Sequence, residues 1–220
     1  MEIIWLGQSC FKIQDKNIIL ITDPYNCELG LKPLQQLEAD IVTVSHNHGD
    51  HNNIGVISGI DKKTPPLIIS DPGEYEIKNV FIYGISCFHD KEQGKQRGLN
   101  TIYLIKINEI TVAHLGDLGH ILSDEQLEKI EKVDILLIPV GGTVTINAKE
   151  AKQIISQIEP KIVIPMHYQI PGLEKTLDGV DKFYSEMSIK KPEIISKLKI
   201  SRKDLISQIE MKIIEMENKH

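Results

Sequence analysis

The sequence predicts an α/β fold built as one domain, and three observations lead to this expectation. Helix-forming segments alternate with short apolar runs in the second half of the chain, as in successive βα units. Residues 18–21 are apolar without alternation, which is typical of a strand covered on both faces. With 220 residues the chain can bury one sizeable core, so residues 1–220 are expected to form a single domain.

The first part of the chain is expected to consist mainly of short strands. Residues 1–22 are rich in β-branched and aromatic residues and predict two or three strands, the last stopped by Asp23-Pro24. Leu31, Leu34 and Leu37 recur at helical spacing and predict a short helix, with Pro33 in its first turn, before a strand over 40–44. The next segments are a helix or loop over 54–60, strands over 65–69 and 80–83, and a turn at 71–73.

The second part supplies the alternating elements. A polar stretch over 89–100 separates strands over 81–88 and 101–107, and its length favours a functional loop over a simple hairpin connection. After a strand over 109–115, capping boxes at Ser123 and Asn147 begin helices that run to about residues 132 and 158, followed by strands over 135–140 and 161–164. The remaining expected elements are a helix over 179–187 capped by Asp178, strands over 194–200 and 211–216, and a helix over 203–209.

Composition limits the classes of partner. Hydrophobic residues make up 41% and charged residues 25%, as in ordinary soluble globular proteins. The net charge of −6 argues against whole-surface attraction to nucleic acid or anionic lipid and favours a small-molecule substrate. Cys10, Cys27 and Cys87 are widely spaced, and no apolar run approaches a membrane span. Free thiols, a cytoplasmic location and no membrane partner are therefore expected, and the oligomeric state is left open, a homo-oligomer included.

The most informative stretch is residues 45–51, which directly follow an apolar run and hold three histidines and an aspartate. His46 and His48 are two positions apart and can point the same way, while the intervening glycine lets Asp50 and His51 aim at a second point. Imidazole nitrogens and carboxylate oxygens suit Zn²⁺ and neighbouring divalent metals. The alternative is a polar turn that carries histidines by chance, although the chain's eight histidines would then be expected to scatter more evenly. One short loop thus predicts ligands for two metal centres.

The pattern His-x-His-x-Asp-His after a buried strand resembles the metallo-β-lactamase superfamily of metallohydrolases. Further matches follow in that family's order: Trp5-Leu6-Gly7-Gln8-Ser9, Thr22-Asp23-Pro24, Phe88-His89-Asp90, His114-Leu115-Gly116-Asp117 and Pro165-Met166-His167-Tyr168. The set is most similar to the small branch that contains the L-ascorbate-6-phosphate lactonase. The resemblance implies a four-layer αββα sandwich with a metal site at one edge between the sheets.

The resemblance also implies a set of seven ligands for two divalent metal ions. One ion would be held by His46, His48 and His89, the other by Asp50, His51 and His167, with Asp117 as the bridge. Zinc is the first expectation, and manganese or iron are alternatives that the same ligands accommodate. Considered without the other motifs, His89 would be interpreted as a surface histidine, Asp117 as a turn former and His167 as a core histidine. Asp23 is expected to be either a turn residue or a hydrogen-bond acceptor for a ligand histidine, and His114 to be structural.

The implied chemistry is hydrolysis by a metal-bridging hydroxide. Two divalent ions about 3.5 to 4 Å apart lower the pKa of a shared water and polarise the oxygen on which charge builds. Asp50 is the catalytic candidate, because it can orient the nucleophile and pass its proton. Candidate substrate contacts lie in or beside the ligand segments: Arg97, which can clamp a phosphate or carboxylate, His120, which can donate to a leaving group, Asn100 and Tyr168. A solvated arginine and a packed tyrosine are the alternatives.

Three functions are compatible with this sequence. The first is a hydrolase that opens a lactone or ester of a small metabolite, with or without a phosphate group. The second is a phosphodiesterase or nuclease, supported by a local basic segment that Glu193 and Asp204 interrupt: Lys190, Lys191, Lys197, Lys199, Arg202 and Lys203. The third is a sensor or interaction module that keeps the metal site without catalysis. A true β-lactamase is not expected, because no secretion signal is present.

Overall fold

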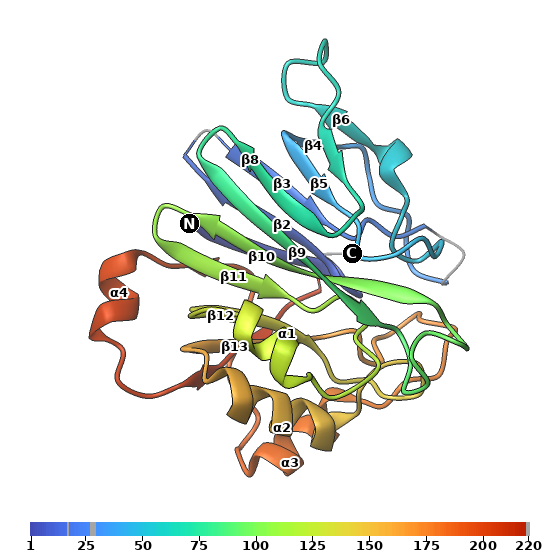
Figure 1. Ribbon diagram of the computed structural model, residues 1–220, viewed down its shortest axis with the longest axis vertical. Helices are drawn as coiled ribbons and strands as arrows, with labels where there is room; N and C mark the ends of the chain where they lie inside the picture. Colours follow the sequence, from blue (N-terminus) through green and yellow to red (C-terminus); the bar gives the residue numbers. More distant parts are fainter. Residues whose placement is uncertain (17, 27–29, 219–220) are drawn as a thin grey trace.

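The computed structural model describes residues 1–16, 18–26 and 30–218, and two mixed sheets form its centre (Figure 1). The first sheet has six strands in the order β15-β1-β2-β3-β5-β7. Its strands are β1 (Glu2–Gly7), β2 (Cys10–Asp15), β3 (Ile18–Thr22), β5 (Ile41–Thr43), β7 (Leu67–Ile69) and β15 (Leu198–Lys199). Because β3, β5 and β7 pair in parallel, the segments that follow them leave from the same edge of the sheet.

The second sheet has seven strands in the order β16-β13-β12-β11-β10-β9-β8. Its strands are β8 (Gly73–Ile77), β9 (Val80–Phe88), β10 (Leu99–Ile107), β11 (Ile110–His114), β12 (Ile135–Pro139), β13 (Ile162–Met166) and β16 (Lys212–Ile213). Every residue of β12 and β13 is buried, as expected of parallel strands covered on both faces. The hydroxyl of Tyr103 in β10 lies 3.0 Å from the carbonyl oxygen of Val44 and 3.2 Å from that of Ile69, so it joins the two sheets.

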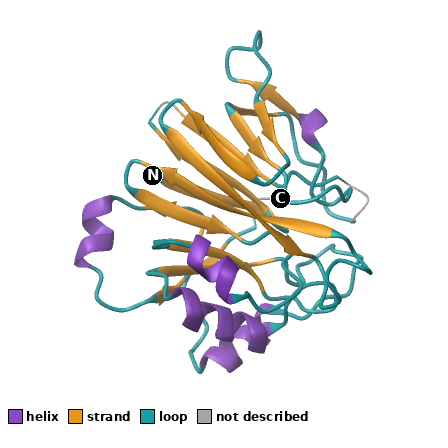
Figure 2. Cartoon of the chain, in the orientation of Figure 1, coloured by secondary structure: helices purple, strands orange, loops and turns teal. Residues whose placement is uncertain are grey.

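The described chain has four α-helices, and all of them come after the first sheet's main strands in the sequence. They are α1 (Asp124–Lys129), α2 (Ala148–Ile158), α3 (Val180–Met187) and α4 (Arg202–Ser207). Capping boxes at Ser123 and Asn147 begin α1 and α2, which confirms the two predicted helix starts. Helices α1, α2 and α3 lie along the β11–β13 side of the second sheet (Figure 2). The predicted α/β sandwich is confirmed, with its α-helices all in the second half of the described chain.

The helix predicted over residues 31–37 is wrong. The structure has an irregular segment there, followed by β4 (Leu37–Ala39), which pairs with β6 (Ile57–Gly59) after the 3₁₀ turn η2 (Ile54–Val56). Leu31 and Leu34 are buried without a helix. Pro33 disfavours helical backbone at the preceding residue. A pattern of three leucines over seven residues is also too short to specify a helix.

Three further expectations need correction. Strand β8 was not predicted, because its alternating sequence follows directly on the expected turn at 71–73. Asp178 does not cap α3; Gly179 is the N-cap, and the Asp178 carboxylate pairs with Lys182. Of the two predicted closing strands, only the short pieces β14 (Ile194–Ile195) and β17 (Glu215–Met216) pair with each other. β15 instead joins β1 and β16 joins β13.

The remaining bulk expectations concern thiols and membranes. Cys10 and Cys87 are buried free cysteines, and Cys27 lies outside the described residues. Across the described ranges, no helix has both the length and the apolar character needed to cross a membrane.

Candidate metal centre

The histidine-rich loop, residues 45–51, is held by both sheets. Just before it, the Val44 N–H donates to the Ile69 carbonyl at 2.8 Å within the first sheet. The Ser45 carbonyl accepts from the N–H of Thr101 in β10 of the second sheet, also at 2.8 Å. Within the loop, the His51 N–H donates to the His48 carbonyl at 2.9 Å and closes a turn. The loop is therefore a fixed part of the sheet edge.

Asp23 orients this loop from beneath. It follows β3 and is fully buried. Its Oδ1 accepts the Ser45 N–H at 2.7 Å, and its Oδ2 accepts from the Ser45 hydroxyl at 2.6 Å and from His51 Nδ1 at 2.9 Å. Holding the proton on Nδ1 leaves His51 Nε2 with its lone pair directed away from Asp23. Of the two alternatives for Asp23, the structure shows the hydrogen-bond acceptor.

Three residues from the second sheet meet the loop. His89 follows β9, Asp117 lies in the turn after β11, and His167 follows β13. The Oδ2 atom of Asp117 lies 3.3 Å from the Nε2 atoms of His51, His89 and His167. All four side chains are at most 1% exposed. Asp117 thus occupies the centre of the cluster.

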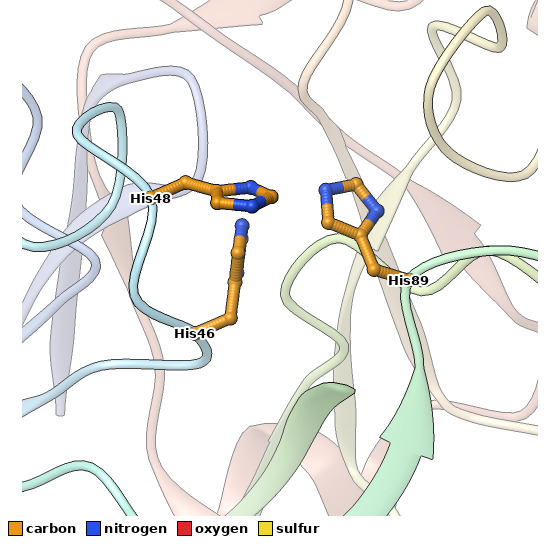
Figure 3. Close-up of side chains that lie close together, drawn as sticks. All are labelled: His46, His48 and His89. Atoms are coloured by element: carbon orange, nitrogen blue, oxygen red, sulfur yellow. The ribbon is translucent and has the colours of Figure 1, made fainter. Parts of the chain in front are cut away.

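The ligand-type atoms fall into overlapping groups, each with its atoms within 4.8 Å of one another. The groups are His46 with His48 and His89, Asp50 with His51 and His167, and His46 with His51 and Asp117. Figure 3 shows the first: His46 and His48 extend from one loop, and His89 faces them from the other side. The structure brings together all seven side chains that the resemblance implied, in the same two triads.

Several polar atoms in this cluster are buried and have no hydrogen-bond partner. They are Nε2 of His46 and His51, Nδ1 of His89, both ring nitrogens of His167 and Oδ2 of Asp117. An unpaired buried polar group costs about 1–3 kcal/mol, so such groups are rare in folded proteins. Imidazole nitrogens and a carboxylate oxygen are metal ligands, and this donor set fits divalent cations.

The ionisation states also fit a metal site. Burial lowers the pKa of His46 to about 3 and that of His167 to about 4, so both rings are neutral near pH 7. Burial opposes the charged form of Asp117, but His167 and His51 outweigh it and hold the pKa of this carboxyl well below its usual range. His51 is the exception: burial lowers its pKa, but Asp117 and Asp23 outweigh that effect and raise it. A cation would replace this proton, because metal ligands must be deprotonated.

Two glycines allow ligand segments to approach closely. A Cβ atom on Gly119 would lie 2.3 Å from the His89 carbonyl carbon and 2.4 Å from the Asp90 nitrogen. A Cβ atom on Gly141 would lie 2.1 Å from the His167 carbonyl oxygen. Both contacts are with backbone, which cannot turn aside as a side chain can. These glycines are therefore part of what positions His89 and His167.

Asp90 organises the polar loop that follows His89. Its carboxylate accepts four backbone N–H groups, from Glu92, Gly94, Gln96 and Arg97, at 2.7 to 2.9 Å. Burial alone would raise the pKa of Asp90, but these hydrogen bonds outweigh it and lower the pKa to about 2. The sequence identified a long loop here without indicating that one carboxylate folds it.

Three of the four predicted substrate contacts serve the fold. Asn100 is 1% exposed; its Oδ1 accepts the Asp117 N–H at 2.9 Å and its Nδ2 donates to the Leu115 carbonyl at 3.0 Å. His120 uses both ring nitrogens on backbone, so neither is free for a leaving group. Tyr168 is buried against Trp5, with ring centroids 5.2 Å apart. These contacts give the three side chains positioning and packing roles, and a direct contact with a substrate stays a prediction for them.

Arg97 remains in position to contact a substrate. It is exposed and lines a cavity of about 410 Å³ together with His46, His48 and Leu99. It also lines a second cavity, of about 350 Å³, on the side of the loop that includes His89.

One charged residue near the centre was not predicted. The Nζ atom of Lys175 lies 3.3 Å from Asp50 Oδ2. It lies eight positions beyond His167, in a segment without a recognisable motif, and no sequence signal indicates this contact. His114 is fully buried and its Nε2 lies 2.8 Å from the Ser9 carbonyl oxygen, in keeping with a structural role.

Known proteins resemble this chain in sequence and in fold. A family described as "Beta-lactamase superfamily domain" matches residues 2–167. A "UPF0173 metal-dependent hydrolase" of Pyrococcus horikoshii is 30% identical, over 76% of this chain and 84% of that protein. A solved structure of a proposed zinc-dependent hydrolase of the metallo-β-lactamase superfamily from Thermotoga maritima is 34% identical, with a TM-score of 0.79 and coverage of 98% and 97%.

More distant structures share the fold alone. The metallo hydrolase Igni18 from Ignicoccus hospitalis is 18% identical, with a TM-score of 0.64 and coverage of 91% of this chain and 99% of that one. The assignment to the branch that contains the L-ascorbate-6-phosphate lactonase stays a prediction. Both the sequence relatives and the clustered ligand-type residues agree with metal-dependent hydrolysis. The chain belongs to the metallo-β-lactamase superfamily and is a metal-dependent hydrolase.

Proposed function

We propose that the protein hydrolyses a lactone or ester of a small anionic metabolite, using two divalent metal ions held by the seven clustered side chains. The observation that carries this proposal is the convergence of three imidazole Nε2 atoms, from His51, His89 and His167, on Asp117 Oδ2. The Nε2 atoms of His51 and His167 and the Oδ2 atom itself are buried without a hydrogen-bond partner. Two ligand triads on either side of one carboxylate favour a pair of ions over a single one.

Three aspartates have separate tasks in the proposed reaction. Bound cations would acidify a water and polarise the substrate carbonyl. Asp117 supplies negative charge between the triads, and Asp23 keeps the Nε2 atom of His51 directed into the centre. Asp50 is 15% exposed, so its carboxylate can reach both the centre and solvent and can accept the proton of the attacking water.

The cavity beside His46 and His48 favours a small substrate. Its volume of about 410 Å³ lies in the range of small-molecule sites. Arg97 provides a guanidinium that can bind a carboxylate or phosphate, and Leu99, which is 62% exposed, provides an apolar surface. These features favour an acidic metabolite with a short carbon skeleton.

The basic segment offers little support for a nuclease. Lys197 and Lys199 both pair with Glu2, and Arg202 pairs with Asp134. With Lys191, which pairs with Glu215, four of the six basic side chains lie beside a carboxylate of the protein. Part of the positive charge is thus compensated, whereas binding to a nucleic-acid backbone requires uncompensated cations. Small-molecule hydrolysis remains the preferred proposal.

The test combines elemental analysis with a substrate panel. Purified protein reconstituted with Zn²⁺, Mn²⁺ or Fe²⁺ is offered lactones, carboxylic esters and phosphodiesters at low and high salt. We expect two metal ions per chain and turnover of lactones or esters with little salt dependence. Asp117→Ala and His167→Ala should lose metal and activity, while Asp61→Ala, at an exposed turn, should keep both.

Three results would contradict the proposal. Unchanged metal content in both Asp117→Ala and His167→Ala would remove these residues from the ligand set. Metal-loaded protein that turns over no member of the panel would favour the sensor or interaction module, and turnover of nucleic acid that falls steeply with salt would favour the nuclease.

A further inference from the structure

Lys175 brings a positive charge to the rim of the metal centre. Its Nζ atom lies 3.3 Å from Asp50 Oδ2, although 125 positions separate the two residues. Among the residues that the structure describes, it is the one lysine or arginine that forms an ion pair with a proposed metal ligand. Its side chain is 30% exposed and that of Asp50 is 15% exposed, so the pair lies where the centre opens to solvent.

The segment that carries Lys175 is folded around Gln169. The Gln169 Oε1 atom accepts the Leu177 N–H at 2.9 Å, and its Nε2 donates to the Leu173 carbonyl at 3.1 Å. The buried side chains of Leu173 and Leu177 anchor the segment on either side of Lys175. The backbone on either side of Lys175 is therefore held in place, which keeps the lysine side chain within reach of Asp50.

The charges around Lys175 favour an anion from outside the protein. Asp50 offers the ammonium group a negative partner as long as no cation shares that carboxylate. Divalent cations at the centre would neutralise the negative charge of Asp50. The positive charge of two such cations would also exceed the combined negative charge of Asp50 and Asp117. An ammonium group beside such a centre is stabilised when an anionic oxygen lies next to both.

We propose that Lys175 binds an anionic group of the substrate, a carboxylate or phosphate oxygen, and thereby selects acidic over neutral substrates. This inference rests on the proposed function and extends it. Arg97 lies beside the His46 and His48 side of the centre, and Lys175 lies beside the Asp50 side. A substrate with an acidic group next to the bond that is hydrolysed would meet one of these cations in either orientation.

The test measures anion binding without turnover. Metal-loaded wild type, freed of excess metal, is titrated calorimetrically with acetate and with inorganic phosphate. Lys175→Met removes the charge with little change in length and should weaken binding about tenfold, the effect of losing one charge-assisted hydrogen bond. Lys175→Arg should retain most of the affinity. The probe that binds wild type more tightly identifies a carboxylate or a phosphate as the preferred group.

The matched control is Lys182→Met, which removes an exposed lysine on α3 that pairs with Asp178. It should change neither anion affinity nor metal content. The proposal is overturned if wild type binds neither probe, or if Lys175→Met binds both as tightly as wild type does. A higher metal content in Lys175→Met would not change that conclusion. Failure of wild type to hydrolyse any substrate would overturn the proposed function and leave the anion-binding result standing.

Discussion

Asn100 fixes the position of Asp117 from beneath the turn that carries it. Its side-chain amide accepts from the Asp117 N–H and donates to the Leu115 carbonyl. The space is tight, because a Cβ atom on Gly116 would lie 2.5 Å from the Asn100 Oδ1 atom. Asn100 therefore controls where the central carboxylate lies without contacting the metal centre's open side.

We expect Asn100→Ala to weaken both folding and metal binding. The substitution leaves the Asp117 N–H and the Leu115 carbonyl unpaired in a buried place, which should lower the free energy of unfolding by about 2 kcal/mol. A less constrained Asp117 should lower metal affinity by about tenfold, as for other residues that orient ligands. Urea unfolding and metal titration measure the two effects. Ser207→Ala, which removes an exposed side-chain hydrogen bond at the end of α4, is the control. Unchanged metal affinity in folded Asn100→Ala would limit this residue to a structural role.

Individual residues differ in how far the sequence can predict them. The clustering of seven ligand-type side chains could be inferred because His46, His48, Asp50 and His51 are crowded into one loop, and that cluster gave weight to isolated candidates elsewhere. Asn100 was predicted as a substrate contact, whereas its side chain bonds the backbone of the turn that carries Asp117. Its position depends on the pairing of β10 with β9, which composition does not specify. Lys175 could not be inferred, since a long side chain reaches Asp50 only through the tertiary fold.

At the scale of elements, Gly119 allows the turn after β11 to pack closely against the backbone of residues 89 and 90, and this close packing helps to position His89. Replacing it by alanine would place Cβ within 2.5 Å of three backbone atoms of residues 89 and 90. We expect Gly119→Ala to displace His89, to lower metal affinity and to destabilise the fold by about 1–3 kcal/mol. Metal titration and thermal unfolding measure these effects. Gly55→Ala, where no atom lies within 4 Å of the new Cβ, should match wild type. Wild-type metal affinity in Gly119→Ala would show that the two segments can separate without cost.

The Asp90 loop predicts an acid-dependent contribution to stability. The pKa of Asp90 falls from its ordinary value of 3.8 to about 2 in the folded protein. Because the folded value is the lower one, the contribution is fully present above pH 3.8 and is lost as pH falls toward 2. Asp90→Asn lacks this charge, so its deficit against wild type should be clear at pH 6 and should shrink at pH 2.5. Urea unfolding of metal-free samples at both pH values checks this, and an equal deficit at both would contradict it.

Local signals explain which elements were predicted correctly. The capping boxes at Ser123 and Asn147 depend on contacts three residues apart, so the starts of α1 and α2 were predicted correctly. The helix predicted over 31–37 is wrong because Leu31 and Leu34 are buried in the core by tertiary packing of an irregular segment, not by a helical period. Of the short strands after residue 190, β15 pairs with β1 and β16 pairs with β13, partners far away in sequence. Their arrangement could not be predicted locally.

At the scale of the whole molecule, the centre joins the two sheets. Residues 46–51 extend from the first sheet, whereas His89, Asp117 and His167 extend from the second. Ligand sets drawn from both sheets give a bound ion a structural effect as well as a catalytic one. In the absence of a cation, the unpartnered nitrogens and the neighbouring carboxylates work against closure of this edge.

Removal of metal should therefore destabilise the protein as a whole. A ligand that binds only the folded state stabilises it by about 2.7 kcal/mol when its free concentration is a hundred times its Kd. For a domain of this size, a loss of that order lowers Tm by about 5–10 °C. Calorimetry of metal-loaded wild type with and without a chelator measures the shift, and hydrogen exchange should increase first at residues 45–51 and 166–168. Asp117→Ala, which is expected to bind little metal, should show no shift with chelator. An unchanged Tm in wild type whose metal has been removed would mean that the two sheets hold this edge closed without help from the cations.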